Sequence, residues 1–272
     1  MKLILFSGNH PRHVFVHAAL CAQHEIAGIV CMEREGLLPT ASVSCDSRDQ
    51  DLFRLHFQRR FEVEQAAYQD ADSRFYDTIA PVLRISPLEL NCEKTWDFVR
   101  RHESDACFIF GTNLLKDELM RILPRWQINL HLGLSPWYKG SATLFWPFYF
   151  MQPQFAGATI HQIDLKADAG EVIHQSAPFL RSGMGIHDVG AEVVRAARDE
   201  AARVLKLLAG GGKLPLAKQR TSGRVFLDRD FEAHHLRVNY ELFGDRMVDA
   251  WLNGHLGSRV PKLVRAFEAG KD

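Results

Sequence analysis

The fold is decided first by residues 2–32, which read KLILFSGNHPRHVFVHAALCAQHEIAGIVCM. A short apolar run over 2–7 stops at Gly8, which is typical of a buried strand that feeds a loop. From Pro11, a favourable residue for the first turn of a helix, apolar residues recur at helical spacing. Residues 26–32 indicate a second buried strand, so the stretch predicts a strand, a helix and a strand joined by a short crossover.

The same alternation continues as far as His131. Apolar runs at 106–110 and 127–131 predict two further strands, and Gly111 and His131 fall at their carboxyl ends. Alternating buried strands and helices predict an α/β fold with a doubly wound, mostly parallel sheet, whose ligand crevice lies at the carboxyl ends of its strands. Helical periodicity is expected at 53–61, 75–83, 96–102 and 115–123.

The pattern changes after residue 156. Apolar and polar residues alternate over 157–163 and 172–178, which predicts two strands joined in a hairpin around 164–170. The clearest helix covers 186–209 and ends at three glycines. We therefore expect a catalytic core over 1–210 and a small C-terminal α+β subdomain over 211–272. Within the latter, the sequence predicts a strand in 221–228 and helices over 231–251 and 261–267.

Composition and charge narrow the class of protein. The 272 residues are 46% hydrophobic and 24% charged, which indicates a globular chain with a sizeable core. Lys and Arg number 33 and so do Asp and Glu, so no overall field attracts a polyanion, and nucleic acid is disfavoured as a partner. Five cysteines, an odd number, and the lack of a long apolar segment indicate free thiols, no membrane span and a cytoplasmic location.

The residues that carry chemistry gather at the end of the strand over 127–131. Asn129 and His131 lie two apart on a strand and therefore share one face. An amide donor and an imidazole aimed at one point suit the oxyanion of a tetrahedral intermediate. Asp168, in a glycine-containing loop, could keep that imidazole protonated, but 37 positions separate it from His131 and the sequence leaves their contact open.

These residues belong to a longer series of motifs. Its members, in order, are Asn129, His131, Ser135, Pro136, Gly140, Gly157, Thr159, His161, Asp168, Gly170, Ile173 and Gln175. The series resembles the signature of the 10-formyltetrahydrofolate-dependent formyltransferases, and the chain is closest in character to the sugar N-formyltransferases. Other members of that family act on glycinamide ribonucleotide or methionyl-tRNA. One departure is that the Ser-Leu-Leu-Pro of the family is Gly-Leu-Ser-Pro at 133–136 here, which leaves the path of this loop open.

The resemblance implies a Rossmann-like core and a role for each catalytic residue. Asn129 and protonated His131 would stabilise the oxyanion formed when an amine attacks the formyl group, and Asp168 would keep His131 charged and assist proton removal. It implies 10-formyltetrahydrofolate as co-substrate and no metal. The folate slot would have one wall formed by Phe110, Gly111, Thr112, Leu114 and Leu115, and the other by Asp164, Ala167, Gly170 and Val172.

The acceptor is expected to be a small amine, and a nucleotide-linked amino sugar is favoured. About 60 residues follow the glycine triplet, without the basic stripe expected of a tRNA-binding domain, whereas the glycinamide ribonucleotide enzymes end near the core. Acceptor contacts are expected from Asn9, Arg12, Ser135, Tyr138 and Lys139. The alternatives are a methionyl-tRNA formyltransferase, a formyltetrahydrofolate hydrolase, which usually has a regulatory domain ahead of the core, and a non-catalytic folate-binding protein.

Other polar features of the sequence are expected to have structural roles. His13, His17, Cys21 and His24 form a loose metal-like spacing that lacks a second ligand cluster. His161 and His174 are expected mainly to pack on or support their strands. Apolar residues of the C-terminal stretch leave open a homodimer interface or packing on the core.

Overall fold

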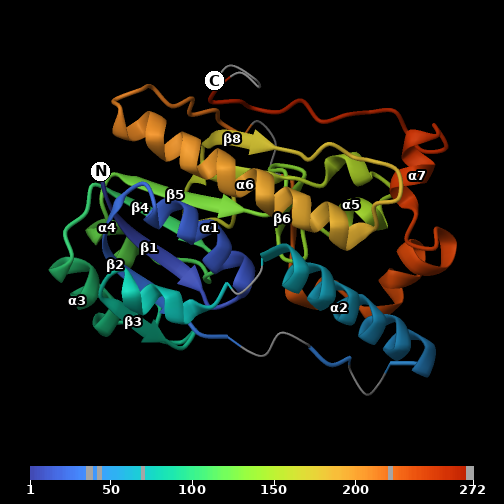
Figure 1. The fold of residues 1–272 in the computed structure, drawn as a ribbon, viewed down its shortest axis with the longest axis horizontal. Helices are drawn as coiled ribbons and strands as arrows, with labels where there is room; N and C mark the ends of the chain where they lie inside the picture. The colour runs from blue at the N-terminus through green and yellow to red at the C-terminus, as the bar shows by residue number, and fades with distance from the viewer. Residues whose placement is uncertain (35–38, 42–44, 69–70, 220–222, 268–272) are drawn as a thin grey trace.

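The structure, a computed structural model, describes residues 1–34, 39–41, 45–68, 71–219 and 223–267. Its centre is a seven-stranded sheet in the order β3-β2-β1-β4-β5-β7-β8 (Figure 1). The first five strands in chain order run parallel and the last two are antiparallel, which confirms the prediction of a mostly parallel, doubly wound sheet. The strands are β1 (Lys2–Gly8), β2 (Glu25–Met32), β3 (Val82–Ile85), β4 (Ala106–Phe110), β5 (Trp126–His131), β7 (Ala158–Gln162) and β8 (Val172–Ser176).

Both faces of the sheet are buried, and the strand sequences show why. Leu3 and Leu5 point into one apolar cluster, while Ile4 and Phe6 point into another on the opposite face. A strand that is covered on both sides has no polar face, so it appears as the continuous apolar run seen in 2–7. The larger cluster packs against α1 (Pro11–Cys21) and α6 (Ile186–Ala209), and the smaller against α3 (Glu93–Arg101) and α4 (Asp117–Ile122).

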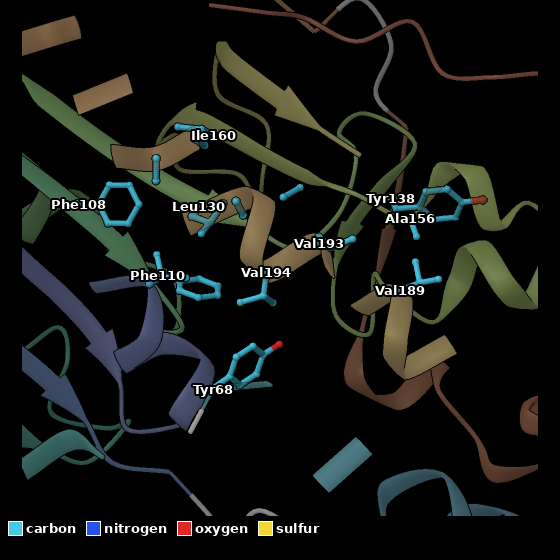
Figure 2. Close-up of a cluster of buried hydrophobic side chains, with 14 of the residues drawn as sticks. Tyr68, Phe108, Phe110, Leu130, Tyr138, Ala156, Ile160, Val189, Val193 and Val194 are labelled. Carbon is cyan, nitrogen blue, oxygen red and sulfur yellow. The ribbon is translucent and has the colours of Figure 1, made fainter. Parts of the chain in front are cut away.

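The larger cluster joins distant parts of the chain. Figure 2 shows Phe110 and Leu130 from the sheet in one cluster with Val193 and Val194 of α6 and with Tyr68 from the end of α2 (Ser47–Tyr68). The expected bounds of α6 are confirmed, because an apolar face repeats along the whole helix and Gly210 ends it. The short α5 (Trp146–Tyr149) and the 3₁₀ turn η2 (Pro153–Phe155) complete this side.

The helix expected over 75–83 is wrong. The chain forms a 3₁₀ turn, η1 (Ser73–Thr78), and then enters β3 beside β2. Pro81 cannot continue a helix, and the Tyr76 hydroxyl is held inside by Ser7 Oγ at 2.7 Å. Tertiary pairing has therefore overridden the local helical period.

The helices expected in the C-terminal stretch are also corrected. Residues 231–251 form several short helical segments instead of one continuous helix, because Gly244 and Asp245 have positive φ angles and interrupt the helical backbone. Residues 261–267 are extended and lie against β8, where Gln175 N donates to Val264 O at 2.8 Å. The elements are η3 (Asp228–Asp230), η4 (Ala233–His235), η5 (Val238–Leu242, a π-helical turn) and α7 (Met247–Leu252).

The C-terminal stretch covers the open edge of the sheet. Beyond α6, Ala217 pairs with Val172 at the start of β8, and residues 264–266 pair with the middle of the same strand. The red segment in Figure 1 runs along β8 in this way. Farther on, β9 (Arg224–Phe226) pairs in parallel with β6 (Tyr138–Gly140), within the expected strand at 221–228, of which Thr221 and Ser222 lie outside the described residues. The division at residue 210 stays a prediction.

The five cysteines are free thiols, and Cys31 and Cys107 are buried in the sheet. None of the helices in the described part of the chain combines the length and the apolar composition that a membrane crossing requires. Over the same described ranges, no three His, Cys, Asp or Glu side chains are grouped as metal ligands would be.

Buried histidines should make the fold sensitive to acid. Burial lowers the pKa of His17 to about 4 and that of His187 to about 3, and holds the pKa of His13 and His56 well below the ordinary value. In the unfolded chain each protonates near pH 6.5, so below that pH the unfolded state binds more protons than the native state. Each should therefore lower the free energy of unfolding by about 1.4 kcal/mol between pH 7.5 and 5.5.

Urea denaturation at the two pH values measures this effect. His17→Phe should remove about one histidine's share of the pH dependence, whereas His255→Phe, at an exposed position, should leave it unchanged. Equal stability of the wild-type protein at pH 7.5 and 5.5 would contradict the assignment of these histidines as buried and neutral.

Candidate active site

The polar site begins where β5 ends, beside β7. The antiparallel register places Asn129 opposite His161 and His131 opposite Thr159. His161 Nδ1 donates to the Gln162 carbonyl at 2.6 Å, so its Nε2 is free to accept a hydrogen bond. Asn129 Nδ2 lies 3.1 Å from that nitrogen and donates to it. This contact fixes the orientation of the Asn129 amide, whose second N–H can serve a ligand.

His131 has an oxygen acceptor at each ring nitrogen. Nε2 donates to the Tyr138 carbonyl at 2.9 Å, and Nδ1 lies 3.4 Å from Asp168 Oδ2. An imidazole with acceptors on both sides is best satisfied when it carries two protons. The turn leaves no room for a side chain at Gly133, where a Cβ would lie 2.4 Å from His131 Nε2. The sequence of the turn therefore helps to define the environment of the imidazole.

Asp168 is the point at which these groups meet. Its Oδ2 accepts the Gly140 N–H at 2.8 Å, and its Oδ1 lies 3.5 Å from His161 Nε2. Burial alone would raise the pKa of Asp168, but the charge of His131 and the Gly140 N–H together hold it well below the usual carboxyl value. The contact that the sequence left open, between positions 131 and 168, is therefore present.

The β7–β8 hairpin brings Asp168 to this position. Gly170 packs so tightly on the neighbouring strand that a Cβ there would lie 1.7 Å from the Gln162 carbonyl oxygen. Asp168 itself has a φ angle of 48°, in the left-handed region that few side chains adopt. Close approach and an unusual backbone conformation thus fold the loop back over the β5 and β7 strands.

The turn after His131 contains three predicted acceptor contacts that are largely buried, namely Ser135, Tyr138 and Lys139. Ser135 donates its N–H to Thr159 Oγ1 and accepts Gln175 Nε2 at its carbonyl, and its peptide bond to Pro136 is cis. The Tyr138 hydroxyl donates to the side chain of Gln152, and Lys139 is 4% exposed. Ser135 and Tyr138 therefore help to hold the turn, and acceptor contacts by any of the three stay a prediction.

The wall expected on the β4 side combines buried and open positions. The Phe110 ring is buried edge-on against His13, Leu115 is buried, and Gly111 has a φ angle of 88°. Leu114 is 55% exposed, an unusual place for a large apolar side chain. Thr112 Oγ1 donates to the carbonyl of the next residue, Asn113.

The wall expected on the hairpin side is similarly mixed. Asp164 is exposed and caps the Lys166 N–H, Ala167 is half-buried, and Val172 is buried in β8. Leu165, between the two expected contacts, is 60% exposed. Each wall thus contains one exposed leucine, and folate contacts there stay a prediction.

The loop after β1 lies at the switch point of the sheet, between β1 and β4. Asn9 Oδ1 accepts the backbone N–H of Arg34 at 3.3 Å. Arg12 lies 3.1 Å and Arg60 3.9 Å from the same carboxylate, that of Glu64. Two guanidinium groups thus lie near the N-terminus of α1, where anions are favoured.

Two residues outside the predicted site, His161 and Gln219, contact its polar residues. His161 was expected mainly to pack, yet it contacts both Asn129 and Asp168. Side chains alternate along a strand, so knowing which strand pairs with 127–131 would have placed His161 on the same face as Asn129. Gln219 Nε2 donates to the carbonyls of Asp168 and Gly170, a contact for which the sequence contains no local signal.

The fold was compared with known proteins. No family model matches the sequence. A phosphoribosylglycinamide formyltransferase from Anaplasma phagocytophilum aligns with a TM-score of 0.54 at 17% identity over 84% of this chain and 98% of its own. A 4-N formyltransferase from Francisella tularensis aligns with a TM-score of 0.54 at 16% identity over 85% of this chain and 77% of its own.

A third solved structure contains ligands. The N-formyltransferase from Helicobacter canadensis, in complex with folinic acid and dTDP-3-aminofucose, aligns with a TM-score of 0.55 at 17% identity, over 87% of this chain and 79% of its own. At this level of identity the likeness concerns the fold. The structural neighbours of this chain are formyltransferases, and the chain has the Rossmann-like formyltransferase fold.

Proposed function

We propose that the protein transfers a formyl group from 10-formyltetrahydrofolate to the primary amine of a small acceptor. The observation that carries the proposal is the meeting of Asn129, His131 and Asp168 at the end of β5, with His161 beside them. A donor amide, an imidazole with two acceptors and a buried carboxylate are the groups that acyl transfer to an amine requires. The formyltransferase fold supports the same conclusion.

Each residue has a distinct task in this proposal. The folate co-substrate, when bound, would supply the formyl group. Asn129 would donate its second amide N–H to the formyl oxygen as negative charge develops there. His131 Nδ1 lies 3.4 Å from the Asp168 carboxylate, which is longer than an ordinary hydrogen bond. Its N–H could therefore also donate to the formyl oxygen. Asp168 would keep His131 charged and receive, directly or through water, the proton that the amine loses. That proton would pass to N10 of the folate as the bond between N10 and the formyl carbon breaks, so that tetrahydrofolate leaves.

The loops after β4 and β7 suit the folate. Their backbone groups can hydrogen-bond a pterin, and the exposed Leu114 and Leu165 offer apolar surface for an aromatic ring. We propose contacts from both expected walls, Phe110, Gly111, Thr112, Leu114 and Leu115 on one side and Asp164, Ala167, Gly170 and Val172 on the other.

We propose that the acceptor is a nucleotide-linked amino sugar. The positive charge of Arg12 and Arg60 beside the N-terminus of α1 suits the phosphates of a nucleotide, and Asn9 lies in the same loop. The Helicobacter canadensis protein was solved with such a sugar nucleotide. Ser135, Tyr138 and Lys139 would contact the acceptor from the turn after β5. A cytoplasmic location is part of this proposal, and a homodimer stays a prediction.

Following tetrahydrofolate release from 10-formyltetrahydrofolate tests the function. Release that depends on one of a panel of nucleotide amino sugars supports the proposal. Release without any amine indicates a hydrolase, tight binding without release indicates a folate-binding protein, and release that requires methionyl-tRNA indicates the tRNA enzyme. Any of these last three results would contradict the proposal.

His131→Ala should abolish most formyl transfer while leaving the fold intact. Loss of one donor to a developing oxyanion costs about 10²–10³ in turnover, and the small side chain creates no clash. Steady-state kinetics and a thermal melt measure the two effects. His234→Ala, at an exposed position, is the control and should be as active as the wild type. Substantial activity of His131→Ala would contradict the assigned role.

Asp168→Asn should lower kcat by about 10²-fold or more and change KM for either substrate only slightly. The amide oxygen can still accept the Gly140 N–H, so the loop keeps its position, but the negative charge beside His131 is lost. Asp199→Asn, which removes a carboxylate from the exposed surface of α6, is the matched control. A kcat within threefold of the wild type would show that the charge of Asp168 has no part in the reaction.

A further inference from the structure

The loop that carries Asp168 is held by a residue far outside the motif region. After α6 the chain returns along the edge of β8, where Ala217 and Val172 exchange two backbone hydrogen bonds of 2.9 Å. In this antiparallel register residue 219 lies opposite residue 170. There Gln219 Nε2 donates to the Asp168 carbonyl at 2.8 Å and to the Gly170 carbonyl at 2.9 Å.

The backbone of this loop needs such support. Asp168 has a positive φ angle, which an aspartate adopts less readily than glycine. Residues 164–166, earlier in the loop, are exposed. The Gly140 N–H holds the carboxylate, and Gln219 holds the carbonyl of the same residue, so that both ends of Asp168 are fixed.

We propose that Gln219 is a positioning residue for formyl transfer. Its amide fixes the backbone at Asp168 and Gly170, and the carboxylate is thereby kept against His131 and His161. The inference rests on the function proposed above, and it adds a residue that acts through Asp168. A displacement of about 1 Å at a reacting group can cost about 10²-fold in rate, so a small shift of this loop would suffice to slow the reaction.

The same part of the chain supports the other partner of the ion pair. β9 pairs with β6, in which Gly140 donates to Asp168 and the Tyr138 carbonyl accepts from His131. Gly140 approaches Phe226 so closely that a Cβ there would lie 2.1 Å from its carbonyl oxygen. Residues beyond α6 therefore hold both the carboxylate and the imidazole.

Gln219→Glu tests the proposal with a side chain of the same shape. At neutral pH a carboxylate cannot donate to the two carbonyls and is repelled by them. We expect kcat to fall by about tenfold to a hundredfold, with KM for both substrates changed less than about threefold. As the pH is lowered towards 5, the introduced acid takes up a proton and can donate one hydrogen bond again, so the ratio of wild-type to variant kcat should decrease.

Gln154→Glu is a matched control. Gln154 Nε2 also donates to two carbonyls, at 2.7 Å to Arg259 and 3.4 Å to Gly257, but in a part of the chain that holds no site residue. Both substitutions should lower the melting temperature, whereas only Gln219→Glu should lower kcat. A kcat of Gln219→Glu within twofold of the wild type, or an equal loss in Gln154→Glu, would overturn the proposal.

Hydrogen exchange separates this inference from the proposed function. The Gly140 amide proton is bound to Asp168 Oδ2, so its exchange in the unliganded protein reports where the carboxylate lies. It should exchange more than about tenfold faster in Gln219→Glu than in the wild type or in Gln154→Glu. If the wild-type protein transfers no formyl group, the proposed function fails, but unchanged protection of Gly140 in Gln219→Glu would independently overturn the positioning role.

Discussion

The buried carboxylate of Asp168 is the constraint on which the site depends. A charge removed from water must be met by opposite charge or by hydrogen-bond donors, and here the His131 imidazole and one backbone N–H meet it. Strand β7 runs antiparallel beside β5, which places His161 against Asn129. The loop after β7 then folds back and brings the carboxylate to the same point. The two antiparallel strands added to an otherwise parallel sheet are thus what make the polar cluster possible.

Close backbone approaches complete this arrangement. Gly133, Gly140 and Gly170 each occupy a position where a Cβ would collide with the imidazole or with a neighbouring carbonyl oxygen. Leaving out the Cβ lets three chain segments surround one ion pair and keep it largely from water. A weakly solvated ion pair interacts more strongly than an exposed one, which suits a site that must keep an imidazole charged beside a ligand.

Much of the core could be predicted from the sequence, because its signals are local. Strand β4 has a continuous apolar run and α6 a long apolar face, and both have the predicted bounds. The segment over 75–83 could not be predicted in the same way, since pairing with β2 decided its conformation. Likewise, Asn129 and His131 follow from the period of a strand, whereas the contact of Gln219 depends on a bridge between distant residues.

The cover over the edge of β8 has a consequence for how the protein is made. Residues 129–168 contain every group of the proposed catalytic cluster, but the support of that cluster comes from residues 217–219 and 224–226, beyond the whole of α6. A nascent chain on the ribosome therefore exposes a sheet with an open edge and an unsupported loop until this later part has emerged. The order of synthesis delays completion of the site until its surroundings can form.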